Sequence, residues 1–445
     1  GGTTVSAGTL KGSTAHLQGA ITNNATVEFE QATAGTYAGA MSGTGNLVKN
    51  GAGALTLSGN SSYAGTTTVS NGTLLINGDN SAVTTPISLV AGTTIGGSGT
   101  HGGLITIAAN TTLSPGTSPG TFTAAAAAWE ADGDYNWQLV NAAGSAGSDW
   151  DLLNVTGVLD ITATSGTPFN VNLWTLSSTG PDVDGNATNF SSNSQYSWKM
   201  ASAAGGVTNF AADKFQVNTA STNGTAGFAN SFGSGQFSIA NAGNDLNLDF
   251  SPAVVFNVGT GTSETQVQQG AVANMTTAVS VTKTGAGTVV MNGTNSYAAA
   301  TAVDAGTLEV TGSLTNSALT VNSGGTLSGT GTVAQLATVL GGGTLAPGAA
   351  SPAGTGILSL GGLSLASTAT TVIAITGPTP GTDFDQVSIL GSGSLGFGGT
   401  LDLSTSNIDS AVAGTSYRLF DFSSTPTGDF ASLTSLGGIY AGITW

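Results

Sequence analysis

The fold is decided by residues 47–80, which read LVKNGAGALTLSGNSSYAGTTTVSNGTLLINGDN. Nearly the same sequence returns at residues 281–312 as VTKTGAGTVVMNGTNSYAAATAVDAGTLEVTG. Lys49 then corresponds to Lys283, and residues 1–10 (GGTTVSAGTL) read as the end of a third copy. Self-similarity of this kind, in short β-rich units between glycines, predicts a solenoid and not a compact globule.

Within each copy, apolar residues alternate with Thr or Ser, as in Leu55-Thr56-Leu57, which is the period of a strand with one buried face. Glycine and asparagine pairs interrupt the alternation and suit tight corners. Asn71-Gly72 by itself would also fit a β-hairpin. Strands repeated in tandem favour coils of about 20–25 residues that stack on one another.

The segment resembles the autotransporter-associated β-strand repeat, with its lysine, Gly-x-Gly-x-Leu-x-Leu, tyrosine, Thr-x-Val and Gly-Thr-Leu positions. Both Lys49–Leu75 and Lys283–Val310 follow that form, although Ala299 stands where the first copy has Gly65. That family occurs in passenger regions of surface proteins of Gram-negative bacteria. The resemblance implies an all-β, elongated β-solenoid, a right-handed parallel β-helix displayed outside the cell.

The duplication extends beyond the repeat. Residues 113–120 (LSPGTSPG) have a counterpart at 345–352 (LAPGAASP), and 148–151 (SDWD) have one at 382–385 (TDFD). Proline removes a donor from a β-ladder, so these elements are expected at corners or edges. We predict two duplicated β-helix units. The first spans 1–252, with the regular repeat at 47–80 and aromatic-rich, wider coils at 125–250, and the second spans 253–445 and is truncated at its end.

Composition excludes several kinds of partner. Six Lys and Arg residues against 23 Asp and Glu residues give a net charge of −17, and the positive charges are scattered along the sequence. Such a chain is a poor ligand for nucleic acid or for an anionic membrane surface. The chain has no cysteine, so stability has to rest on ladders and burial.

The sequence predicts no membrane span, since no apolar run reaches about 18 residues. It also lacks an initiator Met and a signal peptide and starts within a repeat. We therefore expect a processed product or a fragment, with the translocator in a missing C-terminal part.

Four aspartates are the candidates for chemistry because they recur in both copies: Asp149 and Asp151, then Asp383 and Asp385. Alternating carboxylates on one strand face could bind Ca²⁺ or act as an acid/base pair in glycoside cleavage. The favoured alternative is structural, with Asx turns at corners and a solvated strand face. No catalytic residue and no cofactor site is therefore assigned.

Other motifs are expected to be structural. Residues 182–186 (DVDGN) look like a calcium loop but lack the distal Glu and the helices of an EF-hand, so a surface turn is favoured. Residues 391–396 (GSGSLG) match a dinucleotide fingerprint by letters, but a strand follows instead of a helix. Lys49 and Lys283 are expected to snorkel along the coil. Tyr63 and Tyr297 are expected to pack at corners, and His16 and His101 to be isolated.

The sequence thus favours a non-enzymatic extracellular passenger that acts as an adhesin, a stalk or a surface-matrix component. The alternative is a filament subunit that stacks end to end through open coils. A polysaccharide-active β-helix enzyme is the third hypothesis. A host surface, a neighbouring cell or further copies of the same chain all remain open as partners.

Overall fold

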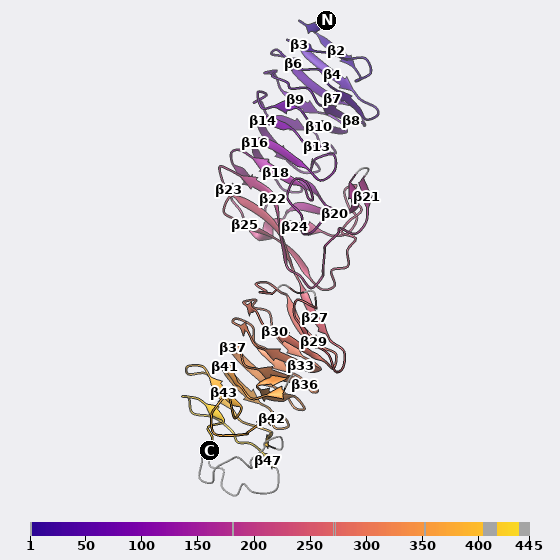
Figure 1. Cartoon of the computed structure of the whole chain (residues 1–445). Coiled ribbons are helices and arrows are strands. Elements are labelled where there is room, and N and C mark those ends of the chain that lie inside the picture. The colour runs from indigo at the N-terminus through magenta and orange to yellow at the C-terminus, as the bar shows by residue number, and fades with distance from the viewer. Residues whose placement is uncertain are drawn as a thin grey trace. The chain divides into compact units, whose positions relative to one another are not determined.

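The computed structural model describes residues 2–179, 182–269, 271, 273–350, 353–403 and 416–435. Nearly all regular structure in these residues is β-strand (Figure 1). Helical structure there is confined to the 3₁₀ turn η1 (Ala212–Lys214), so the described part of the chain contains no helix that could span a membrane. Ser351 and Pro352 of the segment 345–352, and Trp445 at the end of the second predicted unit, lie outside the described residues.

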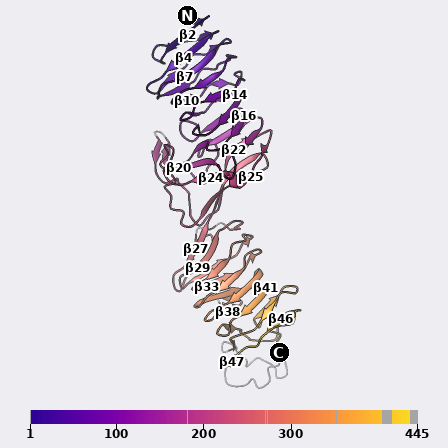
Figure 2. The ribbon, with the colours of Figure 1, turned by 180° about the vertical axis from the view of Figure 1, so that it is seen from behind.

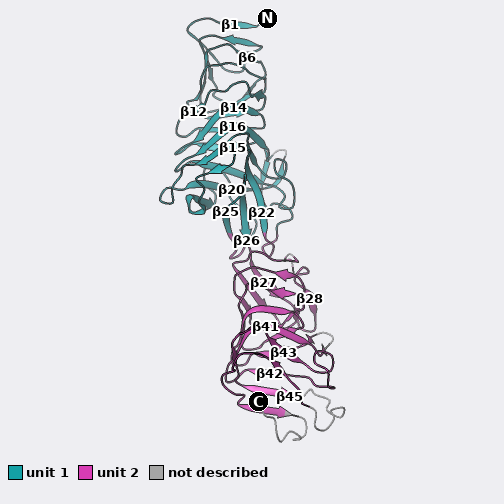
Figure 3. Ribbon diagram, turned by 90° about the vertical axis from the view of Figure 1, so that its left-hand side faces the viewer, with its two compact units in different colours: residues 1–190, 196–231, 237–250 teal, residues 191–195, 232–236, 251–445 magenta. Residues whose placement is uncertain are grey.

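The chain forms two compact units (Figure 3). The first comprises residues 1–190, 196–231 and 237–250, and the second comprises residues 191–195, 232–236 and 251–445. The assignment of 1–252 and 253–445 as duplicated domains stays a prediction.

The first unit contains two long sheets and one short sheet, with strands stacked from coil to coil (Figures 1 and 2). One long sheet has the order β2 (Thr9–Gly12), β4 (Thr26–Glu30), β7 (Asn46–Asn50), β9 (Thr67–Val69), β12 (Ile87–Leu89), β14 (Thr100–Ile107), β16 (Thr121–Trp129), β18 (Leu152–Val155), β22 (Tyr196–Ala203), β26 (Asp245–Ser251) and β25 (Gln236–Ala242), with β11 (Asp79–Asn80), β19 (Leu159–Ile161) and β23 (Val207–Thr208) beside it. The other has the order β5 (Gly35–Tyr37), β8 (Ala54–Leu57), β10 (Thr73–Ile76), β13 (Thr94–Gly97), β15 (Thr112–Pro115), β17 (Asp134–Leu139), β20 (Phe169–Thr179) and β21 (Asp182–Asp184), with β24 (Phe215–Asn218) paired to β20. The short sheet is β1 (Thr3–Val5), β3 (Ile21–Asn23) and β6 (Met41–Ser42).

The second unit repeats the arrangement with two long sheets. The first is β27 (Ala253–Asn257), β29 (Ser280–Thr284), β32 (Thr301–Val303), β35 (Leu319–Val321), β37 (Thr332–Val339), β41 (Ile357–Leu365), β43 (Gln386–Ile389) and β46 (Phe420–Asp421), with β31 (Thr294–Asn295), β34 (Ser313–Leu314) and β44 (Leu395–Gly396) beside it. The second is β28 (Ser263–Thr265), β30 (Thr288–Met291), β33 (Gly306–Val310), β36 (Gly325–Gly329), β38 (Thr344–Pro347), β42 (Thr370–Val372), β45 (Thr400–Leu403) and β47 (Ser432–Ser435). A small antiparallel pair joins β39 (Ala349–Ala350) to β40 (Ala353–Gly354).

The strands of the regular coils pair in parallel with their counterparts one coil away. In the first unit Val27 pairs with Leu47, and Leu47 pairs with Thr67 on the next coil. In the second unit Thr301 pairs with Leu319. The predicted parallel β-helix is therefore confirmed, with regular coils at or just below the short end of the expected length, while its handedness stays a prediction.

The hairpin alternative at Asn71-Gly72 is wrong. The strands before and after this pair, β9 and β10, belong to different sheets, and each pairs only with neighbouring coils. Gly72 has φ +71°, so the corner uses a conformation that L-residues with a side chain adopt at a cost. The same corner residue thus turns the chain from one face of the coil to the next.

Stacked apolar side chains form the core of each unit. In the first unit the column Leu55, Leu74, Ile95, Leu113 and Tyr135 runs through successive paired strands, and all of these side chains are fully buried. In the second unit Val289, Leu308, Leu327 and Leu345 form the equivalent column. Each such aliphatic side chain contributes about 1.5–3 kcal/mol on burial. The alternation read from the sequence therefore supplies one buried column for every inward position.

The coils lengthen where aromatic residues accumulate. Phe122 pairs with Leu153, and Leu153 pairs with Ala201, so each of these turns uses far more chain than a regular coil does. Trp129, Tyr135 and Trp137 are fully buried there, and Trp129 stacks on Phe169 with ring centroids 4.6 Å apart. Large rings fill the wider cross-section. Strands β22 and β26 then pair antiparallel, which ends the regular stacking in this unit.

Gly72→Ala should destabilise the first unit by more than Gly92→Ala. Both positions have positive φ, +71° and +86°, which costs a residue with a side chain about 1–2 kcal/mol. A Cβ at Gly72 would also lie 2.6 Å from the Gly51 carbonyl oxygen, whereas nothing lies within 4 Å of one at Gly92. Denaturant titration of the two variants measures the difference in unfolding free energy. Equal losses would mean that contact between coils at this corner is unimportant.

Candidate functional site

The outer aspartate of each recurrent pair caps a turn. The Asp149 carboxylate accepts a hydrogen bond from the Ser145 N–H at 2.9 Å, and Asp383 accepts one from the Thr379 N–H at 3.0 Å. Neither residue lies in a strand. The two turns are therefore built in the same way in both units, and the carboxylates satisfy backbone donors that would otherwise face only water.

The inner aspartate of each pair is buried. Both Asp151 carboxylate oxygens accept backbone hydrogen bonds, from the Gly120 and Gln138 N–H groups, each at 2.9 Å. The Asp385 oxygens accept from the Gly356 and Ala374 N–H groups at the same distances. The solvated strand face suggested for these residues is therefore wrong, because Asp151 is 0% and Asp385 4% exposed.

Burial governs the ionisation of these inner carboxyls. It raises the pKa of Asp385 to about 6, although the two backbone N–H donors act in the opposite direction. It raises the pKa of Asp151 well above the usual range for the same reason. Calcium binding at the four aspartates stays a prediction. Both oxygens of each inner carboxylate are already engaged, and the described residues contain no group of three or more His, Cys, Asp or Glu suited to a metal.

The repeat lysines do not snorkel to solvent, which corrects the sequence prediction. Lys49 is 0% exposed, and its Nζ donates to the carbonyl oxygens of Asn50, Gly51 and Asn71 at 2.7–3.1 Å. Lys283, also 0% exposed, makes the equivalent bonds to Thr284, Gly285 and Ala305 at 2.6–3.0 Å. Burial lowers the pKa of both amines. The glycine-rich corner brings three carbonyls to one point, and an ammonium with three donors satisfies them all.

The repeat tyrosines pack inside, as predicted. Tyr63 and Tyr297 are 2% and 1% exposed, and their hydroxyls lie 2.7 and 2.8 Å from the Thr67 and Thr301 hydroxyls. Burial raises the pKa of each phenol to about 12. Neither ring face is available to a sugar or to any other external ligand.

The two histidines differ in burial: His16 is exposed and His101 is buried. His16 lies in an exposed loop, with Nδ1 3.1 Å from the Ser13 hydroxyl. His101 pairs with Asn80 on the neighbouring coil and is 1% exposed. Its Nε2 has no hydrogen-bond partner among the described residues, and burial lowers the pKa of the imidazole to about 4. The corresponding pair in the second unit is Leu314 with Val333, so an apolar residue takes the place of His101 there. His101 is thus a neutral core residue and not part of a catalytic group.

The surface turn expected at residues 182–186 is wrong, because Asp182–Asp184 form a strand. Asp182 and Asp184 belong to β21, which pairs antiparallel with the end of β20. Asp182 accepts from the Ser118 hydroxyl and the Gln138 amide, and Asp184 accepts from the Trp174 indole at 2.7 Å. The glycines at 391–396 are followed by strand β45 and not by a helix, as the sequence predicts.

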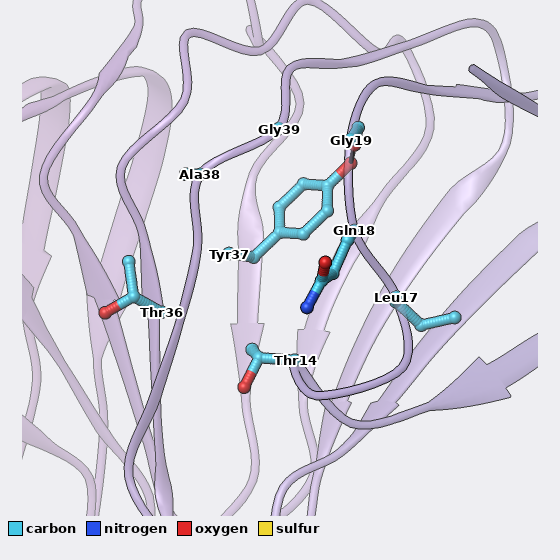
Figure 4. A pocket seen from close by; sticks show the side chains of 8 residues that line it. All are labelled: Thr14, Leu17, Gln18, Gly19, Thr36, Tyr37, Ala38 and Gly39. Atoms are coloured by element: carbon cyan, nitrogen blue, oxygen red, sulfur yellow. Dashed lines mark hydrogen bonds between the residues drawn. The ribbon is translucent and has the colours of Figure 1, made fainter. Parts of the chain in front are cut away.

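An open hollow of about 310 Å³ lies beside the loop that carries His16 (Figure 4). The Tyr37 ring crosses it toward Gly19, and the phenol donates to the Gly19 carbonyl oxygen at 2.7 Å. Its lining residues are Thr14, Leu17, Gln18, Gly19, Thr36, Tyr37, Ala38 and Gly39. Burial raises the pKa of Tyr37 to about 12, so the hollow offers no group that exchanges protons near neutral pH.

Sequence reasoning missed an asparagine ladder on the outward face of three wide coils. Asn136, Asn172 and Asn218 occupy one register column on β17, β20 and β24. The Asn172 amide donates to Asn136 at 3.0 Å, and the Asn218 amide donates to Asn172 at 2.8 Å. The signal was an asparagine next to apolar residues in each of three segments, YNWQ (135–138), FNVNLW (169–174) and FQVN (215–218). Its register could not be read, because these coils differ in length.

Comparison with known proteins identifies the repeat family. The pattern described as passenger-associated-transport-repeat matches residues 1–11, 47–76 and 281–310, which include both buried lysines and both buried tyrosines. The chain is a passenger of the autotransporter type. A passenger of this kind is extracellular or lies on the surface of a Gram-negative bacterium.

The passenger is also similar to the adhesin BmaC autotransporter of Brucella suis biovar 1 (strain 1330). The two are 41% identical over 117 residues, which is 26% of this chain and 3% of that adhesin. The chain therefore corresponds to a small fraction of that protein's length.

Lys49→Met should lower the unfolding free energy of the passenger by about 1–3 kcal/mol, because it leaves three buried carbonyls without a donor. Lys11→Met is the matched control. Lys11 is 52% exposed and pairs with Glu28 and Glu30 at the surface, where an ion pair contributes about 0–1 kcal/mol. Urea denaturation of both variants gives the comparison. Equal effects would show that the corner carbonyls are satisfied without the lysine.

His101→Val should remove an acid-sensitive component of stability. The folded pKa of about 4 lies below the usual 6.5, so between these values the unfolded chain binds the extra proton. His101 therefore destabilises the fold progressively as pH falls from 6.5 to 4. Thermal unfolding over that range should show a smaller loss for His101→Val than for the wild type, with the exposed His16→Gln as control. Parallel pH profiles for all three chains would contradict the buried neutral state.

Proposed function

We propose that the passenger is a non-enzymatic adhesin. The observation that carries the proposal is the similarity to a protein described as an autotransporter adhesin, together with repeats found in passengers. The recurrent residues suited to chemistry support the same conclusion. The inner aspartates, the lysines and the tyrosines of both copies are all buried and bound to their own unit.

The stacked coils present repeated polar groups and loops that an adhesin could use for binding. Outward positions of the second unit present hydroxyls in register, at about 4.8 Å per rung. This column contains Ser263, Thr288, Thr307, Thr326, Thr344, Thr370, Thr400 and Ser432. Loops between the strands are held by the same stacking, and loops on a rigid scaffold are common places for recognition. Binding would be weak at each site and would gain strength from several contacts at once.

The other two hypotheses receive no specific support. An enzyme built on Asp149 and Asp151 would need both carboxylates to reach substrate, yet Asp151 is fully buried. End-to-end stacking into a filament stays a prediction that the described residues leave untested.

Attachment of beads coated with the purified passenger to cultured epithelial cells tests the proposal. We expect several-fold more bound beads than with an unrelated β-helical protein at the same coating density, because adhesion is multivalent. Electron microscopy of the same preparation and glycan-hydrolysis assays accompany the measurement. Binding equal to the control, continuous fibres, or turnover of a glycan that is lost in Asp149→Asn would each contradict the proposal.

A further inference from the structure

The loop of residues 219–228 lies across the outward face of the wide coils in the first unit. It begins at the end of β24, which pairs with β20. The Asn223 amide reaches the Thr112 hydroxyl on β15 at 3.0 Å and the Asn136 side-chain oxygen on β17 at 3.2 Å. The loop therefore crosses from β24 over two neighbouring strands to a third.

The asparagine ladder holds this loop in place. The Asn136 amide donates to the Asn223 carbonyl oxygen at 2.9 Å. On its return the loop bonds to Thr175 of β20, through the Gly227 carbonyl at 3.1 Å and the Ala229 N–H at 2.8 Å. Within the loop, the Ser221 hydroxyl donates to the Thr225 carbonyl at 2.6 Å. A loop with so many anchors is preorganised and loses little entropy when a ligand binds.

A hollow of about 450 Å³ opens along the start of this loop. Its lining residues are Val217, Asn218, Thr219, Ala220, Ser221 and Thr222. The hydroxyls of Thr219 and Thr222 and the side-chain oxygen of Asn218 have no hydrogen-bond partner among the described residues. Three of the residues that line the hollow thus carry polar atoms that no other described residue binds: two hydroxyls that both donate and accept, and one amide oxygen that accepts.

The chemistry of the lining selects a neutral, hydroxylated ligand. The lining contains no charged side chain, so it offers nothing to balance an ionic group. The nearest lysine in sequence, Lys214, is bound to the carbonyl oxygens of Ile161 and Asn209. The net charge of −17 further disfavours anions. The hollow is shallow and open to solvent, and one chain segment lines it, so a ligand would lie against residues 217–222 and not be enclosed.

We propose that the hollow at residues 217–222 binds a neutral hexose unit of a surface glycan. The hydroxyls of Thr219 and Thr222 exchange hydrogen bonds with sugar hydroxyls, and Asn218 accepts one more. The site lacks an aromatic platform, so its affinity for a single sugar is in the millimolar range. Its contribution to attachment rests on the adhesin function proposed above.

Saturation-transfer NMR of the whole chain with the methyl glycosides of glucose, galactose and mannose tests the site. At least one should give a signal, and the double variant Thr219→Val/Thr222→Val should weaken its binding about tenfold or more, because two hydrogen bonds are lost. The control is Thr56→Val/Thr68→Val, which removes two half-buried outward hydroxyls on regular strands. Both double variants keep side-chain size, so circular dichroism should match the wild type.

Absence of a signal from all three glycosides would overturn the site, and so would equal binding by the two double variants. The bead assay separates this result from the adhesin function. Attachment that survives in Thr219→Val/Thr222→Val after hexose binding is lost would place adhesion elsewhere and leave the hexose site supported. Hexose binding by a wild-type chain whose beads do not attach to cells would contradict only the adhesin function.

Discussion

The structure depends on one constraint: each regular coil must return the backbone in register with the coil before it. Paired rungs, such as Val27 with Leu47 and Thr301 with Leu319, share inter-strand hydrogen bonds. Since every interior strand is paired on both sides, its backbone donors and acceptors are satisfied without disulfides or helices. The stacked apolar columns then follow, because register places equivalent inward positions on top of one another. A register slip by a single position would turn every inward side chain outward.

Corners are where this constraint is most demanding. The chain must change direction within a very short segment, and its carbonyls converge as it does so. Lys49 and Lys283 resolve this by placing one ammonium against three carbonyls in the same geometry in both units. Asp151 and Asp385 do the reverse, with one carboxylate accepting from two backbone N–H groups. Lys49, Lys283, Asp151 and Asp385 are thus internal supports, and their burial makes them inaccessible to a ligand.

Only polar groups that do not bind the neighbouring coils are available to bind a ligand. In regular coils these form the outward column of hydroxyls, and in the wide coils they lie on the loops that run over the sheet. The ladder of Asn136, Asn172 and Asn218 shows how the second kind arises, since amides in register both donate and accept along the stack. The loop of residues 219–228 is ordered by that ladder, so its unused hydroxyls are held in fixed positions above a rigid base.

The sequence by itself determined the repeat, the alternation of buried and outward residues and the parallel coils, because each of these depends on local periodicity. The passenger class came from the resemblance of residues 47–76 and 281–310 to a known repeat family. The buried tyrosines could also be read from it. What it could not decide was the environment of single polar residues. Lys49, Asp151 and His101 each look solvent-accessible in a hydrophilic stretch, and their burial follows from contacts between segments that lie a full coil or more apart in the chain. The tertiary structure alone brought Asn223 over Thr112 and Asn136, since the coils between them differ in length and their register depends on packing.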